Sequence, residues 1–176
     1  MSATSYSLHY LPEEDRIALM FTSDEQRLPC LLLTRRLTRM LCQQIKTFIE
    51  KNINRSYKED STYKNELYKF EHESAVESSS VKLQQKPQKI TLNSNNLALV
   101  TRISIQPGVQ ALNFIFSKKD FVLMKLELSW QQVHCFFYAL ARISKQAVWD
   151  IEEICDWESS ESPIFMLDNR KERLLS

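Results

Sequence analysis

The sequence predicts an α+β fold in which a ββ(β)α unit occurs twice, with one or two antiparallel sheets backed by two helices. Three observations lead to this prediction. Short runs rich in alternating apolar residues, separated by polar turns, occur in both halves of the chain. Each set of runs is followed by a longer segment whose apolar residues recur every three or four positions, as in an amphipathic helix. Segments 17–45 and 112–140 align without a gap, so that strand, turn, strand and helix coincide.

The first unit is assigned to 1–53. Strands are expected at 5–10, 16–22 and 27–33, with polar turns between them. After Thr34 the apolar spacing becomes that of a helix, and Thr34 is the expected N-cap because its hydroxyl can accept a hydrogen bond from a free backbone N–H. The apolar stripe of this helix consists of Leu37, Met40, Leu41, Ile45, Phe48 and Ile49.

The second unit is assigned to 90–146 and repeats this order. Strands are expected at 97–105, 110–117 and 121–128, followed by a helix over 130–143. Ser129 and Gln132 have the spacing of a capping box, in which each side chain accepts a hydrogen bond from the other residue's backbone N–H. Because few residues are identical in the aligned segments, two unrelated hairpin–helix units are the alternative to a duplication.

Between the units, 54–89 is expected to be a flexible polar linker. It is rich in serine and in charges of both signs and contains few aliphatic residues. Little apolar burial is therefore available to offset the entropy lost when such a segment becomes ordered. Within the linker, 63–70 is able to form a short helix.

The composition excludes several classes of function. Because Gly108 is the only glycine, no glycine-rich loop for a phosphate or a dinucleotide is present. The four cysteines form no CxxC pair and the three histidines belong to no catalytic motif, so we expect no enzyme activity, no metal site and no cofactor. The N-terminus has no signal-peptide pattern, and no apolar run approaches the ~20 residues that cross a bilayer, so we expect a cytoplasmic protein without a membrane partner.

The start of the first helix is the strongest candidate for a binding site. Arg35, Arg36 and Arg39 lie where the helix dipole leaves partial positive charge, which is unfavourable for cations. With Lys46 they belong to a segment, 34–46, that contains no acidic residue. The second half has no arginine at the aligned positions, so the fold does not require them. We therefore predict that these four residues bind an anion, either phosphate or a carboxylate-rich peptide.

A structural role for the arginines is the alternative interpretation. In that case they pair with Glu13, Glu14 and Asp15, or their aliphatic stems pack against the linker. The net charge of the chain is only +1, so attraction to any polyanion must come from a local patch such as this one.

The C-terminal segment, 147–176, combines acidic and large apolar residues. Six acids lie between Asp150 and Glu161, before the next basic residue. Trp149, Trp157 and Phe165 are the aromatic residues of the segment. They are expected either to pack in the core, as large apolar residues commonly do, or to bind a partner. In a third interpretation the segment folds back and masks the arginines.

These features favour a non-enzymatic binding or adaptor protein, which acts as a subunit or accessory factor of a larger assembly. Its protein partner is expected to be acidic or anionic, because the candidate site is basic. The alternative is a single-stranded nucleic-acid-binding protein, in which the three arginines and Lys46 bind phosphates and an aromatic residue stacks on a base. The candidates for stacking are Tyr6, Tyr10 and Phe21.

Two short elements carry a resemblance to known proteins. An LxLTRRL element follows a PEEDRIxLxF hairpin within residues 8–41, and this combination resembles one in small, uncharacterised bacterial proteins of similar length. The resemblance implies a bacterial origin and a fold with a variable middle segment, and it implies no function. In outline, a duplicated strand-rich unit that ends in a helix is also similar to PUR-repeat and Whirly-type single-strand-binding proteins, whose sequence motifs are absent here.

Overall fold

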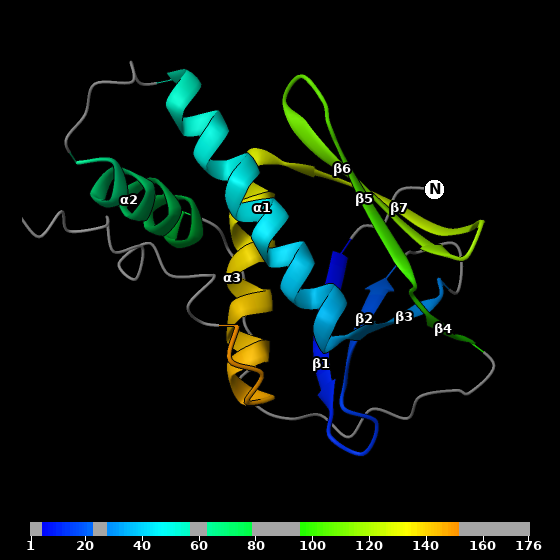
Figure 1. Ribbon diagram of the computed structural model, residues 1–176. Coiled ribbons are helices and arrows are strands. Elements are labelled where there is room, and N and C mark those ends of the chain that lie inside the picture. The colour runs from blue at the N-terminus through cyan, green and yellow to red at the C-terminus, as the bar shows by residue number, and fades with distance from the viewer. Residues whose placement is uncertain (1–4, 23–27, 57–62, 79–95, 152–176) are drawn as a thin grey trace, which may run out of the picture.

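The computed structural model describes residues 5–22, 28–56, 63–78 and 96–151, which form a mixed α+β fold (Figure 1). The predicted fold class is confirmed. The strands are β1 (Ser5–Leu11), β2 (Arg16–Thr22), β3 (Cys30–Thr34), β4 (Leu97–Leu99), β5 (Arg102–Pro107), β6 (Ala111–Lys118) and β7 (Phe121–Ser129), and the helices are α1 (Arg35–Ser56), α2 (Lys64–Glu77) and α3 (Trp130–Gln146).

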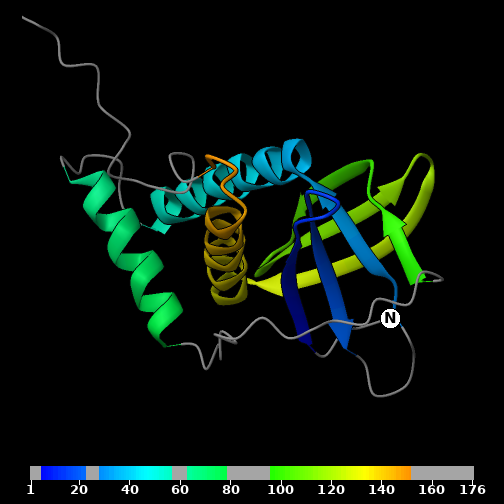
Figure 2. The ribbon, with the colours of Figure 1, turned by 90° about the horizontal axis from the view of Figure 1, so that it is seen from below.

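The strands form two sheets, with the orders β1-β2-β3-β4 and β5-β6-β7. Figures 1 and 2 both place helices α1 and α3 between these sheets and helix α2. The two sheets and the two longer helices therefore enclose the interior, while α2 covers the side of the helices that faces away from the sheets.

In the first half, an antiparallel meander leads directly into α1. β1 pairs with β2 and β2 pairs with β3, so the three predicted strands are found with small shifts at their ends. The hydroxyl of Thr34 accepts a hydrogen bond from the backbone N–H of Leu37 (3.3 Å), as expected for an N-cap. The helix continues to Ser56, beyond the predicted boundary of the first unit at residue 53.

The second half contains the same order of elements, with antiparallel β5, β6 and β7 followed by α3. The predicted capping box is confirmed: the Gln132 N–H donates to Ser129 Oγ (3.4 Å), and the Ser129 N–H donates to Gln132 Oε1 (2.9 Å). A common origin of the two halves stays a prediction, because two unrelated hairpin–helix units would show the same order.

The strand predicted at 97–105 is divided between the two sheets. The backbone N–H of Val100 donates to Leu32 of β3 (3.0 Å), whereas that of Thr101 donates to Ser117 of β6 (2.9 Å). Adjacent residues thus bond to different sheets, and the chain bends between β4 and β5. β4 pairs with β3 in parallel, so the expectation of a purely antiparallel sheet is wrong for this pair.

Part of the predicted linker is ordered. Helix α2 packs on α3, and its Tyr68 is buried, with a hydroxyl that donates to Asn54 Oδ1 of α1 (2.8 Å). The short helix that the sequence suggests at 63–70 is found as the first part of α2, where Tyr68 is buried and Leu67 packs against the common core. The boundaries of the linker stay a prediction. Residues 57–62 and 79–95 lie outside the described part of the chain.

One hydrophobic core joins the two halves. It contains buried residues of β2, β3 and α1 from the first half and of β6, β7 and α3 from the second. Phe136 of α3 is 0% exposed, and its ring packs edge-on against Tyr6 of β1 (5.2 Å between centroids) and Phe114 of β6 (5.6 Å). Units 1–53 and 90–146 therefore share their interior rather than forming separate cores.

Replacing Ser129 by alanine is expected to lower the free energy of unfolding by about 1 kcal/mol, because the Gln132 N–H at the start of α3 loses its acceptor. Urea denaturation monitored by circular dichroism measures the change. Ser104→Ala, at an exposed position of β5, is the matched control and should change the free energy of unfolding by less than about 0.5 kcal/mol. Equal losses in the two variants would show that the cap makes no specific contribution.

Candidate functional site

The four predicted cations lie on two flanks of α1. Because an α-helix turns by about 100° per residue, Arg35, Arg39 and Lys46 follow one flank, whereas Arg36 lies with Met40 toward another. In Figure 1, α3 lies on one side of α1 and β5 on the other. The first flank faces α3 and the described end of the C-terminal segment, and the second faces β5.

Arg35 is neutralised by the C-terminal segment. Its Nη2 lies 2.9 Å from Oδ2 of Asp150, and both side chains are exposed. An exposed pair of this kind contributes at most about 1 kcal/mol to stability, so its main effect is to compensate the charge and to hold the segment beside α1. The ion-pair partner of Arg35 is therefore Asp150 rather than Glu13, Glu14 or Asp15.

A buried tryptophan fixes residues 147–151 against the β1–β2 turn. Trp149 is 2% exposed, and its indole N–H donates to Oδ1 of Asp15 (2.6 Å). The hydroxyl of Tyr10 donates to the same oxygen (3.0 Å), and the rings of Tyr10 and Trp149 pack edge-on. The hydrogen bond from Trp149, the one from Tyr10 and the charges of Arg35 and Arg16 hold the pKa of Asp15 below its usual value.

Trp149 therefore packs in the core, which corrects the prediction that it binds a partner. A side chain with almost no exposed surface offers no contact area to another protein. The other two aromatic residues of the predicted partner-binding segment, Trp157 and Phe165, lie outside the described residues.

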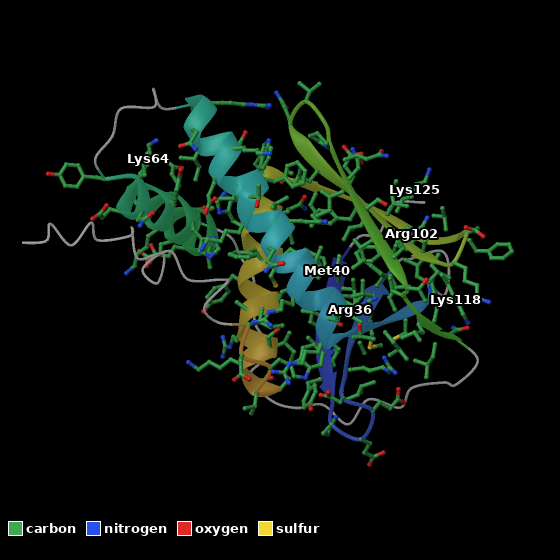
Figure 3. The ribbon with its side chains drawn as sticks, in the orientation of Figure 1. Arg36, Met40, Lys64, Arg102, Lys118 and Lys125 are labelled. Carbon is green, nitrogen blue, oxygen red and sulfur yellow. The ribbon has the colours of Figure 1, made fainter. Side chains whose placement is uncertain are left out.

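A groove lies between the second flank of α1 and the first residues of β5. Its volume is about 120 Å³. Arg36 lines it from the helix and Arg102 from the strand, and Met40, which is 46% exposed, lines it as well. Figure 3 shows these three residues on the same face of the molecule. The apolar side chains of Leu37, Leu41 and Ile103 form part of the remaining lining.

Three exposed arginines, Arg36 and Arg102 at the groove and Arg39 on the first flank of α1, are uncompensated within the described residues. The side chains of Arg36, Arg39 and Arg102 form no ion pair or hydrogen bond with another described residue, and all three are exposed. Guanidinium groups present a planar fork of donors that matches a carboxylate or a phosphate. The groove therefore offers two such forks beside an apolar surface.

The charge continues onto the outer surface of the β5-β6-β7 sheet. Lys118 and Lys125 are exposed, and Figure 3 shows both on the face that carries the groove. Asp120 and Glu127 are acidic residues of the same region, but neither of them lines the groove. The lining of the groove therefore carries two arginines and no acidic residue.

No family model, curated protein or solved structure matches the chain. Within the described ranges, no three His, Cys, Asp or Glu side chains gather as metal ligands. None of the described helices is long and apolar enough to span a membrane.

Two predicted residues occupy unexpected positions. Met40, which the apolar stripe predicts to be buried, is exposed because the core face of α1 is centred on Ile45 and Ile49. Lys46 is half-buried and, at 1.5 Å per residue, lies about 15 Å along the helix axis from Arg36. Lys46 does not line the groove, so the structure separates it from Arg36.

The sequence provided no indication that Arg102 belongs to the candidate site. The alternation of polar and apolar residues in 102–106 places Arg102 on the solvent side of a strand. Nothing local in the sequence indicates that this strand lies opposite Arg36. The pairing of the two arginines across the groove is therefore a result of the tertiary fold.

The remaining titratable pair of note lies away from the groove. Nδ1 of His72 on α2 is 3.0 Å from Nδ1 of His134 on α3. Burial lowers the pKa of each imidazole to about 4, so both rings are neutral at pH 7, and one nitrogen must donate while the other accepts. Burial also raises the pKa of the Cys30 thiol to about 11, which makes that thiol a poor nucleophile.

Proposed function

We propose that this protein is a non-enzymatic binding protein, an adaptor or accessory subunit, that holds an acidic segment of a protein partner in the groove between α1 and β5. The observation that carries the proposal is the placement of Arg36 and Arg102 on opposite sides of an apolar groove with Met40 exposed in it. Arginine binds carboxylates through two parallel hydrogen bonds. The expected partner segment therefore carries one aliphatic residue flanked by glutamate or aspartate.

The size of the groove supports a peptide side chain rather than a cofactor. Sites for drug-sized ligands and cofactors usually measure about 300–1,000 Å³. The groove, at about 120 Å³, is closer to a cavity of about 150 Å³, which holds one benzene ring. One isoleucine or leucine side chain fits a space of this size, whereas a nucleotide does not.

Single-stranded nucleic acid is the second candidate, and one observation favours it. Phe121 is 78% exposed at the turn that follows Lys118, and cations beside an exposed aromatic ring are typical of single-strand-binding surfaces. However, none of the described residues that line the groove is aromatic. Of the residues proposed to stack on bases, Phe21 is buried, and Tyr6 and Tyr10 are half-buried. The acidic peptide is therefore the better candidate.

Alanine at both Arg36 and Arg102 is expected to weaken the binding of an acidic peptide by a factor of about 10–100, because a hydrogen bond to a charged group contributes about 1.5–3 kcal/mol. The probe is a fluorescein-labelled peptide with one isoleucine between glutamates, and fluorescence anisotropy measures its affinity. The affinity for the wild-type protein should also fall as the salt concentration rises, since these charges are exposed.

The matched control for this experiment is Lys51→Ala with Arg55→Ala. It removes the same net charge from exposed positions near the C-terminal end of α1 and should leave the affinity unchanged. A peptide with glutamine in place of glutamate should bind at least tenfold more weakly. Equal losses in the two double variants would contradict the proposal, and binding of oligothymidylate without binding of the peptide would favour the nucleic-acid function instead.

A further inference from the structure

The outer face of the β5-β6-β7 sheet adjoins the candidate groove. On β5, Arg102 and Ser104 are exposed, and both point to this face because side chains alternate between the two faces along a strand. Arg102 also lines the groove. Figure 3 shows Lys125 of β7 on the same side of the molecule as Arg36 and Arg102. A ligand in the groove therefore has this face of the sheet beside it.

The pairing of the strands identifies the residues on this face. Two rows of paired residues cross it: Arg102, Ser117 and Val122 form the first row, and Ser104, Ile115 and Lys125 form the second. Residues that pair across antiparallel strands point to the same face of the sheet. The two rows therefore lead from the edge of the groove on β5 to Val122 and Lys125 on β7.

This face combines apolar surface with an uncompensated cation. Val122 is 54% exposed, and Ile115 is half-buried without being part of the common core. Lys125 is exposed and forms no ion pair or hydrogen bond with another described residue. Glu127 lies in the row beyond Lys125, and Asp120 lies in the turn before β7. Neither acid therefore belongs to the two rows.

An extended chain of about four residues spans the distance from the groove to Lys125. Neighbouring strands lie about 4.8 Å apart and residues two positions apart on a strand about 7 Å, so Lys125 lies about 12 Å from Arg102. An extended chain covers about 13 Å in four residues, and every second side chain points to the same side. When one side chain occupies the groove, the side chain two positions later lies over Ile115 and Val122. The one four positions later reaches Lys125.

We infer that the acidic partner segment extends from the groove across the outer face of the β5-β6-β7 sheet, with an apolar side chain on Ile115 and Val122 and a further carboxylate on Lys125. The inference rests on the proposed function and deepens it, because it adds two contacts to those in the groove. The segment then carries an isoleucine or leucine, an apolar residue two positions later and a glutamate or aspartate four positions later. The sheet and the groove together select the partner.

A longer probe peptide tests this extension. After its second glutamate, the peptide with one isoleucine between glutamates continues with valine, serine and glutamate. A second long probe carries the same extension in mirrored order on the other side, because the side-chain contacts do not depend on the direction of the chain. We expect one of the two long probes to bind about tenfold more tightly than the short one, since an exposed ion pair and a partly covered valine each contribute about threefold.

Two controls show whether the added residues use the contacts on the sheet. Lys125→Ala should weaken the binding of that long probe about threefold and leave the binding of the short probe unchanged. Arg142→Ala removes an exposed cation of α3 and is the matched control, which should change neither affinity. Exchanging valine and serine in the long probe should lower its affinity about threefold, because the valine then points away from the sheet.

The contact with the sheet can also be observed directly. With 13C-labelled isoleucine methyl groups, Ile115→Val assigns the δ-methyl signal of Ile115. This signal should shift when the long probe binds and stay in place with the short probe, which ends at the groove. The signal of Ile143 on α3 is the control and should not move with either probe.

The outcomes separate the inference from the proposed function. If the short probe binds through Arg36 and Arg102 but neither long probe binds more tightly or moves the Ile115 signal, the inference is overturned and the proposed function stands. Equal losses of long-probe affinity in Lys125→Ala and Arg142→Ala overturn the inference as well. If a long probe moves the Ile115 signal but binds equally well without Arg36 and Arg102, the proposed function fails at the groove while the contact on the sheet is supported. If no probe binds, both are wrong.

Discussion

Phe136→Ala is expected to lower the free energy of unfolding by about 3–5 kcal/mol. Removing a fully buried aromatic ring loses the transfer free energy of that ring and also leaves a cavity in the core. The ring contacts Tyr6 from one sheet and Phe114 from the other. The substitution therefore weakens the packing of both halves on α3. Because small domains are stable by only about 5–15 kcal/mol, a large part of the total stability is lost.

Urea denaturation, followed by tryptophan fluorescence and by circular dichroism, measures this effect. Phe121→Ala is the matched control, because Phe121 is 78% exposed, and it should change the free energy of unfolding by less than about 0.5 kcal/mol. The wild-type protein should show one transition with both probes, since its two halves share a core. Two separate transitions, with Phe136→Ala affecting only one of them, would contradict a shared core.

Acidification is expected to destabilise the docking of α2, with a loss on the order of 3 kcal/mol for each of its two buried imidazoles between pH 7 and pH 4. Burial lowers the pKa of His72 and His134 from 6.5 to about 4. A group whose pKa is lowered by folding stabilises the folded state above its unfolded pKa, here 6.5, and this contribution is lost as the pH falls toward 4. A second proton on the pair would also place two cations 3.0 Å apart.

The pKa values and the stability can be measured separately. Titration of the imidazole protons by NMR gives the pKa of each ring, and urea denaturation at several pH values gives the stability. His72→Gln with His134→Gln should reduce the pH dependence between pH 6.5 and pH 4, whereas His9→Gln should largely preserve it. Glu71, whose charge acts to raise the pKa of His134, limits the effect of burial on that ring. If both imidazoles instead titrated near pH 6.5, the two rings would be exposed to solvent and the predicted pH dependence would be wrong.

The arginines at the start of α1 illustrate how far a sequence predicts a site. Their position against the helix dipole, without nearby acids, marked them as unusual. Which of them is compensated depends on Asp150, which lies 115 residues from Arg35. Which of them lines a groove depends on β5, an element of the other half. The sequence predicted the group of cations, and tertiary contacts separated Arg35 from Arg36.

The same distinction applies to the fold. Thr34 and Ser129 were identified as caps because a cap binds a backbone N–H within the next three residues, and that contact is encoded locally. The bend at Val100 and Thr101 was not predicted, because the pattern of polar and apolar residues at these two positions does not differ from that of their neighbours. Their backbone donors pair with Leu32 and Ser117, which no local pattern connects.

The sequence by itself thus determined the strands other than the division between β4 and β5, both long helices, their caps and the basic character of the start of α1. Each of these depends on periodicity, turn residues or charges within a few positions of each other. Only the tertiary structure decided that α2 docks on α3, that Trp149 reaches Asp15 across 134 residues, and that Arg102 faces Arg36. These contacts join residues that are distant along the chain, and they form only when burial of the common core brings the two halves together.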